Sequence, residues 1–172
     1  MPFAYYKRLS PTRQATYRRS DGITEVPLPD ARAVRTLIPP LLEALADEHP
    51  RRVQQSCQAI TDTILLQLEA PPAQIVVFDV RPSDSRGELH GLYEPSEPPY
   101  VSRISLWMRT AQRERLVAFR TFLRTLLHEL LHHLDYEHFG LEETFHTEGF
   151  YMRESSLFHQ LIPRSGPRRA TS

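Results

Sequence analysis

The sequence predicts one α+β domain, and three observations support this fold class. Two helical patterns come first, three strand-like segments occupy the middle, and two further helical patterns follow. Helices that are grouped apart from the strands are typical of α+β architecture, whereas α/β folds alternate the two. A length of 172 residues with 40% hydrophobic and 24% charged residues suffices for one buried core and leaves little room for a second domain.

The two ends of the chain are expected to be basic arms around this domain, which spans residues 30–163. Residues 1–29 contain four prolines and no sustained hydrophobic period, so we expect an extended arm that is partly disordered. Five basic side chains and no acid lie within residues 1–20, and the tail 164–172 is basic as well. Such arms either remain solvated or hold an anionic partner, and nucleic acid is one candidate.

Two amphipathic helices are expected over residues 30–70. Asp30 is a suitable N-cap for the first of them, whose apolar residues recur at helical spacing. Pro39 and Pro40 lie inside this pattern and predict either a kink or a division into two short helices. The second helical pattern begins at Pro50 and has its own apolar face.

Strands are expected over residues 74–108. Residues 74–80, QIVVFDV, have the composition of a buried strand, and residues 100–108 alternate in the manner of a strand. The segment RPSDSRGEL that follows the first strand reads as a loop. Residues 89–94, LHGLYE, are then expected to return as the second strand of a hairpin.

The longest helix is expected over residues 112–139. Gly140 is well placed to end it, because glycine readily adopts the left-handed conformation that follows many helices. A last helix is expected over residues 147–162, where it stops before Pro163. No internal repeat and no low-complexity segment interrupts this order.

The long helix carries a motif with metal-binding spacing, His128-Glu129-x-x-His132. Residues four apart on a helix differ by about 40° in azimuth, so both imidazoles project from one face, one turn apart. They are suited to bind Zn²⁺, and Glu129 between them is placed to act as general base on a metal-bound water. Five leucines around the motif indicate a buried helix.

The sequence offers several candidates for the third metal ligand. His133 follows a ligand directly and is expected at the surface or as a group that orients another imidazole. His138 lies about 240° from His132 around a continuous helix and therefore points away from the metal. The chain can turn back only after Gly140, which leaves His146 and three carboxylates open as ligands, namely Glu142, Glu143 and Glu148.

The combination of TLLHELLH with a later His146 and Phe150 resembles the SprT-like zinc metallopeptidase domain, which includes the Spartan proteases. That family ends its active-site helix in a similar motif and supplies a third histidine in an H-x-x-x-F pattern. The resemblance covers roughly residues 75–161 and implies a zincin-like fold with one Zn²⁺ held by His128, His132 and His146. The chain departs from the family in having Thr147 directly after the third histidine and no cysteine-rich zinc ribbon.

Four other polar residues are candidates for supporting roles around such a metal. Asp135, Glu137 and Glu148 are placed to orient an imidazole through a hydrogen bond. Tyr151 would stabilise an oxyanion if its side chain faces the metal.

The resemblance implies a zinc metallopeptidase that acts on proteins or peptides, with Glu129 as general base. Two alternatives belong to other classes: a YbeY-type endoribonuclease that uses His138 as third ligand, and a zincin fold that binds without catalysis. No apolar run is long enough to span a membrane and no secretory signal begins the chain, so we expect a cytoplasmic protein without a membrane partner. The single cysteine, Cys57, excludes an intrachain disulfide and is expected as a buried side chain.

Overall fold

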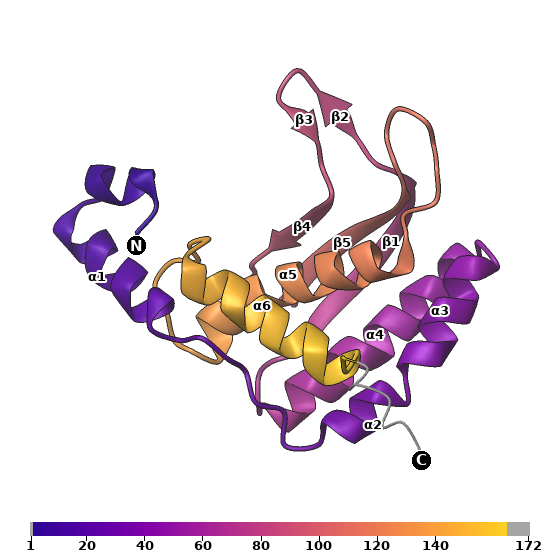
Figure 1. Ribbon diagram of the computed structural model, residues 1–172, viewed down its shortest axis with the longest axis horizontal. Coiled ribbons are helices and arrows are strands. Elements are labelled where there is room, and N and C mark those ends of the chain that lie inside the picture. The colour runs from indigo at the N-terminus through magenta and orange to yellow at the C-terminus, as the bar shows by residue number, and fades with distance from the viewer. Residues whose placement is uncertain (1, 165–172) are drawn as a thin grey trace, which may run out of the picture.

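The structure, a computed structural model, describes residues 2–164 and has the α+β architecture predicted from the sequence (Figure 1). Of the basic tail predicted at residues 164–172, only Arg164 lies within the described residues. The elements in chain order are the 3₁₀-helix η1 (Ala4–Arg8), α1 (Pro11–Asp21), α2 (Ala31–Arg35), α3 (Ile38–Ala46), α4 (Pro50–Gln67), β1 (Ala73–Val80), β2 (Ser83–Asp84), β3 (Gly87–Glu88), β4 (Gly91–Glu94), β5 (Ser102–Arg109), α5 (Phe119–Glu137) and α6 (Glu148–Leu161).

The central sheet has three strands in the order β1-β5-β4. β5 runs parallel to β1, with Ala73 paired to Ser102, and antiparallel to β4, with Gly91 paired to Leu106. The predicted hairpin between the first strand and residues 89–94 is therefore wrong, because both segments pair with β5 instead. The physical reason lies in β5, whose side chains are the most thoroughly buried of the three strands and take the central position.

The two edge strands of this sheet, β1 and β4, contact different helices. Along β1, side chains of α4 occupy the backbone groups that a further strand would use: Gln58 accepts a hydrogen bond from the Ile75 amide at 2.8 Å, and Gln54 accepts one from the Val77 amide at 3.0 Å. The other edge, β4, lies beside α5. An unpaired strand edge is a template for another extended chain, and α4 removes that possibility on the β1 side.

The predicted helices are present, with two adjustments. Pro39 and Pro40 fall in the first turn of α3, so the first predicted helix is indeed divided into α2 and α3. The long helix begins at Phe119 instead of residue 112, because the Val117 amide bonds the Met108 carbonyl at 2.7 Å and extends the strand's pairing. Local propensity did not reveal this long-range contact.

The N-terminal arm is not extended, and this expectation is corrected by the structure: η1 and α1 occupy most of it. Ser10 caps α1 by accepting a hydrogen bond from the Arg13 amide, and Pro11 fits the first turn, where an amide hydrogen is not needed. Tyr17 is 1% exposed on the helix face that meets the rest of the molecule. The helix lacks an apolar stripe because most of its contacts are polar, which explains why hydrophobic periodicity did not predict it.

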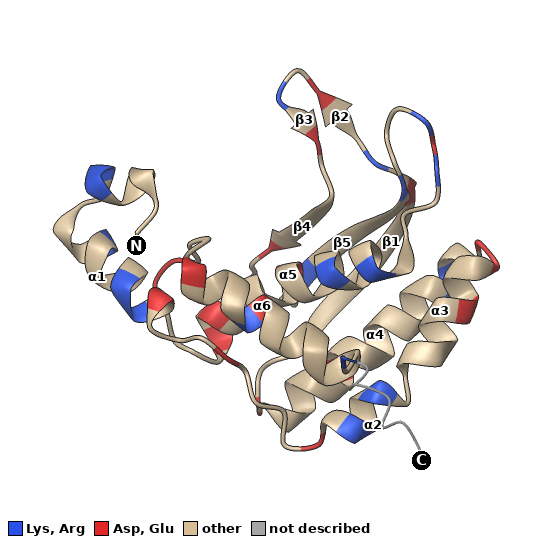
Figure 2. Cartoon of the chain, in the orientation of Figure 1, with Lys and Arg blue, Asp and Glu red and all other residues tan. Residues whose placement is uncertain are grey.

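Charged side chains of the arm face acidic ones of the loop between α5 and α6. Figure 2 shows basic positions of α1 beside acidic positions of that loop, and the two closest pairs are Arg13 with Glu143 at 2.7 Å and Arg19 with Glu142 at 3.0 Å. Three of the five basic side chains of the arm thus have partners within the chain: Arg13 and Arg19 in these ion pairs, and Arg18 in a hydrogen bond with the Tyr6 hydroxyl.

One hydrophobic core unites the helices and the sheet. It includes the leucines that surround the HExxH motif, and Cys57 is fully buried in it, as predicted. Within residues 2–164, no helix combines the length and the apolar character needed to cross a membrane.

Candidate metal centre

α5 places the first two histidines of the candidate site on one face. The helix continues without interruption from Phe119 to Glu137, so His128 and His132 lie one turn apart, with their ring centroids separated by 5.0 Å. The opposite face of this part of α5 is buried among core leucines and fixes the rotation of the helix about its axis.

His146 reaches the same place from the loop that follows α5. Gly140 has a φ of 60°, which lets the chain reverse, and the Leu141 amide bonds back to the Asp135 carbonyl at 2.8 Å. Thr147 caps α6 by accepting a hydrogen bond from the Phe150 amide at 2.9 Å. This capping role explains Thr147 at a position where the SprT-like pattern has glycine, and it holds His146 just before the helix start.

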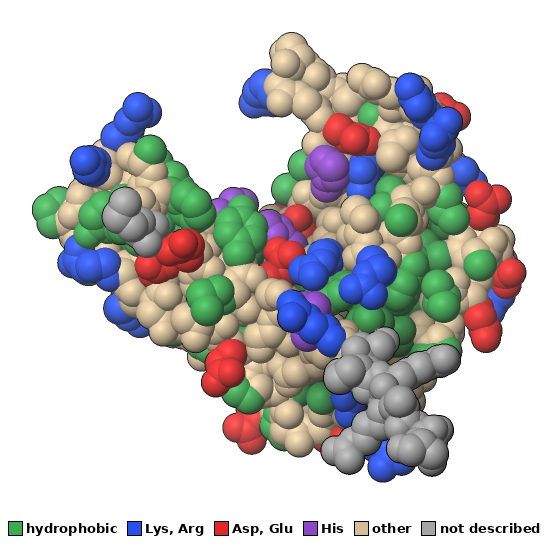
Figure 3. Space-filling model, viewed as in Figure 1, with side chains coloured by type: hydrophobic (Ala, Val, Ile, Leu, Met, Phe, Trp, Pro, Cys, Tyr) green, Lys and Arg blue, Asp and Glu red, His purple; other side chains and the backbone are tan. Residues whose placement is uncertain are grey.

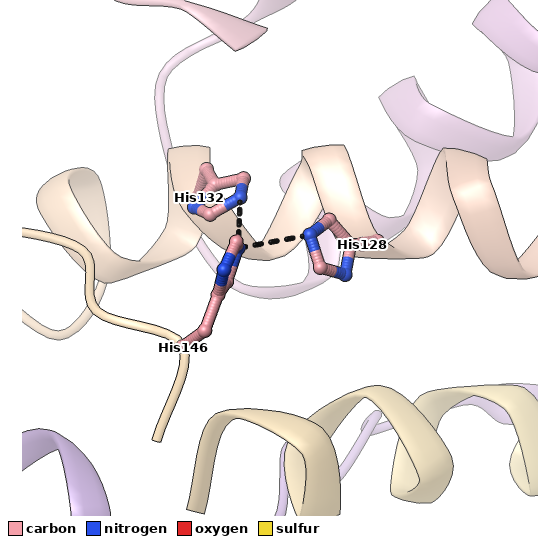
Figure 4. A group of neighbouring side chains, drawn as sticks. All are labelled: His128, His132 and His146. Atoms are coloured by element: carbon pink, nitrogen blue, oxygen red, sulfur yellow. Dashed lines mark hydrogen bonds between the residues drawn. The ribbon is translucent and has the colours of Figure 1, made fainter. Parts of the chain in front are cut away.

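The three imidazoles converge on one point (Figure 4). Nε2 of His146 lies 3.0 Å from Nε2 of His128 and 3.1 Å from Nε2 of His132. Three nitrogens that each bind one tetrahedral Zn²⁺ at the usual length would lie about 3.3 Å apart, so the observed spacing agrees within a few tenths of an ångström. Among the described residues, these three histidines form a group whose ligand atoms all lie within 4.8 Å of one another, close enough to bind a metal ion.

Glu154 of α6 determines which nitrogen of His128 carries hydrogen. Its Oε2 lies 2.9 Å from Nδ1 of His128, and a carboxylate only accepts hydrogen bonds. Nδ1 is therefore the donor. Nε2 of His128 is left with a lone pair that faces the other two rings.

A longer hydrogen-bond chain determines which nitrogen of His132 carries hydrogen. The Thr144 hydroxyl donates to Oδ2 of Asp135 at 2.8 Å and must therefore accept from Nδ1 of His132, which lies 2.7 Å away. Arg153 holds the Asp135 carboxylate in place through a hydrogen bond of 2.9 Å to Oδ1, and both side chains are fully buried. Nε2 of His132 is again left with a lone pair directed at the centre.

The donor set is thus suited to a cation. The Nε2 atoms of His128 and His132 both present lone pairs, and His146 has at most one hydrogen on its Nε2 to offer to the two of them. Lone pairs at this spacing repel one another unless a cation lies between them. Histidines whose other nitrogen is fixed by a carboxylate or hydroxyl are typical of protein metal sites.

The site also favours neutral imidazoles. Burial lowers the pKa of His132 to about 3, and the nearby rings of His128 and His146 act in the same direction. Burial and the proximity of His128 likewise lower the pKa of His146. Neutral imidazole is the form that binds a metal, so few protons compete for these two ligands at neutral pH.

Glu129 lies at the edge of the same site, on α5 against β4. It is 8% exposed, and burial raises its pKa to about 7 despite the opposing effects of His128 and of a hydrogen bond from the Tyr93 amide. Gly91 makes this packing possible: a Cβ at that position would lie 2.7 Å from Oε1 of Glu129. A titratable group with a shifted pKa beside a metal-binding group is a candidate general base.

Phe150 forms the floor of the histidine group. Its ring centroid lies 5.0 Å from that of His128, 4.9 Å from His132 and 5.1 Å from His146, and the side chain is fully buried. The phenylalanine four positions after the third histidine therefore contacts every imidazole and excludes water from beneath them.

A cleft of about 330 Å³ opens in front of the histidines. Its walls come from β4, α5 and the α5–α6 loop, and its lining residues are Gly91, Leu92, Tyr93, Pro95, His128, Glu129, His132, Tyr136, Thr144 and His146. Figure 3 shows histidine side chains at the surface in the hollow between the N-terminal segment and the opposite side of the molecule. The three histidines are therefore accessible from this cleft.

Two further histidines of the long helix lie elsewhere. His133 is only 1% exposed and bonds the Pro71 carbonyl at 2.7 Å through Nε2, so it belongs to the core, and the surface position considered for it is wrong. His138 lies 3.1 Å from the Leu68 carbonyl through Nδ1 and is not part of the metal-binding group. The ligand set required by an endoribonuclease of the YbeY type is therefore not assembled.

The acidic candidates for the third ligand, Glu142, Glu143 and Glu148, do not belong to the group of ligand atoms formed by the three histidines. Glu142 and Glu143 bond to Arg19 and Arg13, and Glu148 begins α6. Tyr151 lies near the site, with its ring centroid 5.9 Å from that of His146, and is 45% exposed.

Sequence reasoning missed three residues that orient the imidazoles: Thr144, Arg153 and Glu154. Glu154 lies one turn after Phe150 on α6, so a helical face that contains Phe150 could have indicated it. Asp135 was considered for such a role, and it acts on His132 through Thr144. For Thr144 and Arg153 the sequence holds no comparable signal.

Comparison of the chain with protein-family models, with curated proteins and with solved structures finds no match. The functional assignment therefore depends on the geometry of this site and on the motif resemblance.

Proposed function

We propose that the protein is a zinc-dependent metallopeptidase of the SprT-like type, with Zn²⁺ held by His128, His132 and His146. The observation that carries this proposal is the position of Glu129: a buried carboxylate with a raised pKa lines the same cleft as the three histidines, whose ligand nitrogens converge on one point. Peptide-bond hydrolysis by HExxH enzymes requires this combination of three ligands, one open position and one base.

The choice of zinc follows from the donor atoms. Three neutral imidazoles suit Zn²⁺, whereas Mg²⁺ and Ca²⁺ prefer oxygen ligands. A zinc ion bound there would lower the pKa of a coordinated water to about 7 and polarise the carbonyl of a peptide.

The chain's own residues would then transfer the proton. Glu129 accepts a proton from the attacking water and returns it to the amine that leaves when the peptide bond breaks. The raised pKa of about 7 in the metal-free site is suited to both steps. The Tyr93 amide and the close approach of Gly91 keep the carboxylate in one orientation.

The substrate proposed for the cleft is an extended peptide segment of a protein. β4 is the sheet edge that borders the cleft, whereas α4 covers the edge at β1. An extended chain that adds to β4 would pass in front of the histidines and Glu129. Flexible or unfolded proteins supply such segments more readily than compact domains do.

Cleavage of an unfolded, fluorescently labelled protein tests the proposal. Zinc-loaded wild-type protein should cleave it, a chelator should abolish cleavage, and Glu129→Gln should keep one equivalent of zinc but lose at least about 100-fold in kcat/KM. Glu137→Gln is the matched control, because Glu137 is an exposed acid of the same helix that does not line the cleft. Zinc-loaded protein that cleaves no substrate would support the non-catalytic alternative instead.

Addition of DNA to the same assay examines the proposed nucleic-acid partner. If the basic side chains recruit nucleic acid, the cleavage rate should change with DNA and the change should weaken as salt rises. Equal rates with and without DNA would remove that role.

A further inference from the structure

The N-terminal segment contacts the loop that carries His146, and it contacts Arg153, which belongs to the hydrogen-bond chain that orients His132. We propose that η1 and α1, residues 4–21, are a positioning element of the metal centre that fixes His146 directly and His132 through buried Arg153. This inference rests on the proposed metal site and assigns a role to a segment that the motif resemblance does not cover.

The contact with His146 is direct. The Tyr5 hydroxyl donates a hydrogen bond of 3.2 Å to the backbone carbonyl of His146. The Tyr5 ring packs against Tyr17 and Phe145, with centroid distances of 5.7 Å and 6.4 Å.

The loop before His146 is held by the same segment. Arg13 forms two parallel hydrogen bonds of 2.7 Å to the carboxylate of Glu143, the bidentate geometry that gives an arginine–carboxylate pair its directionality. Glu142 accepts hydrogen bonds from Thr16 at 2.9 Å and from Arg19 at 3.0 Å. Both ion pairs are partly exposed, so their combined value is to restrict the loop's conformations more than to stabilise the fold.

A buried connection links the end of α1 to His132. The Arg153 guanidinium donates to the carbonyls of Ser20 at 2.6 Å and Ile23 at 2.5 Å, and on its other side to Asp135 at 2.9 Å. A fully buried guanidinium needs such acceptors, and carbonyls at the end of α1 supply them. Asp135 in turn orients His132 through the Thr144 hydroxyl.

The fit between α1 and α6 leaves no space for adjustment. A Cβ on Gly149 would lie 2.4 Å from the Asp21 carbonyl oxygen, and the Gly149 amide donates to the Asp21 carboxylate at 3.0 Å. Ser20 and Thr147 also approach one another, with their hydroxyl oxygens 3.4 Å apart. α1 therefore contacts the residue that caps α6, directly after His146.

A purely stabilising segment and a positioning segment differ in what their variants change. Loss of a stabilising contact lowers the unfolding midpoint and leaves the metal affinity of the folded protein unchanged. Loss of a positioning contact lowers metal affinity and alters coordination while the protein remains folded. Deletion of the whole segment would leave the buried Arg153 side chain without its acceptor at the Ser20 carbonyl and could unfold the protein, so point variants are the sharper test.

The first experiment measures Zn²⁺ affinity of the full chain by competition with a chromophoric chelator. Tyr5→Phe removes only the hydroxyl that bonds His146 and should weaken binding about 2- to 10-fold. Tyr100→Phe is the matched control, because it removes an exposed hydroxyl outside both the N-terminal segment and the lining of the cleft, and it should bind zinc as the wild type does. Circular dichroism at the assay temperature establishes that each variant is folded.

The second experiment exchanges the charges of one ion pair. Arg13→Glu should weaken Zn²⁺ binding about 10-fold and change the visible absorption spectrum of the Co²⁺-substituted protein, while Arg13→Glu with Glu143→Arg should restore both. The equivalent exchange of Arg52 and Asp47, an ion pair far from the histidines in sequence and outside the cleft, should change neither. Wild-type affinity and an unchanged Co²⁺ spectrum in both Tyr5→Phe and Arg13→Glu would overturn the inference. Wild-type protein that binds no metal would instead refute the proposed metal centre itself.

Discussion

Oε2 of Glu154 lies 2.9 Å from Nδ1 of His128 and selects the imidazole tautomer that leaves Nε2 free for a metal. Glu154 is 14% exposed in its side chain and comes from α6, whereas His128 comes from α5, so the pair also depends on how the two helices pack. Residues that orient a metal ligand in this way contribute strongly to metal affinity in other proteins.

Substitution of Glu154 should therefore weaken zinc binding without unfolding the protein. Glu154→Ala removes the acceptor and should lower Zn²⁺ affinity about 10- to 100-fold. Glu154→Gln keeps an acceptor oxygen without the charge and should fall between that variant and the wild type. Titration with zinc in the presence of a chelator measures all three proteins, and equal affinities would contradict the tautomer argument.

The hydroxyl group of Thr144, and not its methyl group, should be needed for full stability and full zinc affinity. Thr144→Val keeps the shape of the side chain but leaves Nδ1 of His132 and Oδ2 of Asp135 without their shared partner, at a cost of about 1–3 kcal/mol in the free energy of unfolding. Zinc affinity should fall about 10-fold as well. Thr144→Ser preserves the hydroxyl and serves as the control in both measurements, urea unfolding and metal titration. A valine variant that behaves like the serine variant would refute the hydrogen-bond chain.

Gly91 should be required for catalysis by Glu129 and not for zinc binding. An added Cβ would lie 2.7 Å from Oε1 of Glu129 and 2.8 Å from Cγ2 of Thr125, so either β4 or the carboxylate must move. Gly91→Ala is expected to retain zinc and to lose more than about 10-fold in kcat/KM, because catalytic groups tolerate little displacement.

Gly22→Ala is the control for this variant, since its Cβ would make only ordinary contacts of 3.5 Å or more. An alanine at position 91 with full peptidase activity would show that the close packing of Glu129 against β4 is not needed.

Glu129 should destabilise the metal-free protein at alkaline pH. Its folded-state pKa of about 7 is above the ordinary value of 4.5, so between these values the folded protein binds a proton that the unfolded chain has lost. The contribution of Glu129 to stability therefore decreases as pH rises through this window. Glu129→Gln, which cannot ionise, should be more stable than the wild type at pH 8 by up to about 3 kcal/mol and similar to it at pH 5.

Urea unfolding in the presence of a chelator measures this difference. The lowered pKa values of His132 and His146 make the folded protein less stable in acid, which is the opposite pH dependence. Both proteins contain these histidines, so their contributions cancel in the comparison. A glutamine variant that is less stable than the wild type at pH 8 would contradict the inferred burial of the charged base.

Local patterns in the sequence were sufficient for much of the fold and for the choice of histidines. Helical spacing placed His128 and His132 on one face of α5, and Gly140 marked where the chain reverses, as its φ of 60° confirms. These features depend on interactions within a few residues, which a sequence displays directly. The resemblance of HExxH, His146 and Phe150 to the SprT-like pattern then singled out His146 from the remaining candidates.

The tertiary structure decided how those histidines are held. Arg153, Thr144 and Glu154 orient two imidazoles through contacts with residues between nine and twenty-six positions away. α1 contacts the loop before His146 from more than a hundred positions away. The sheet order β1-β5-β4 likewise reflects pairing between distant segments. Polar and long-range contacts leave no period in the sequence. The sequence alone therefore determined which residues meet at the candidate metal centre, and only the folded chain determined which partners fix their orientation.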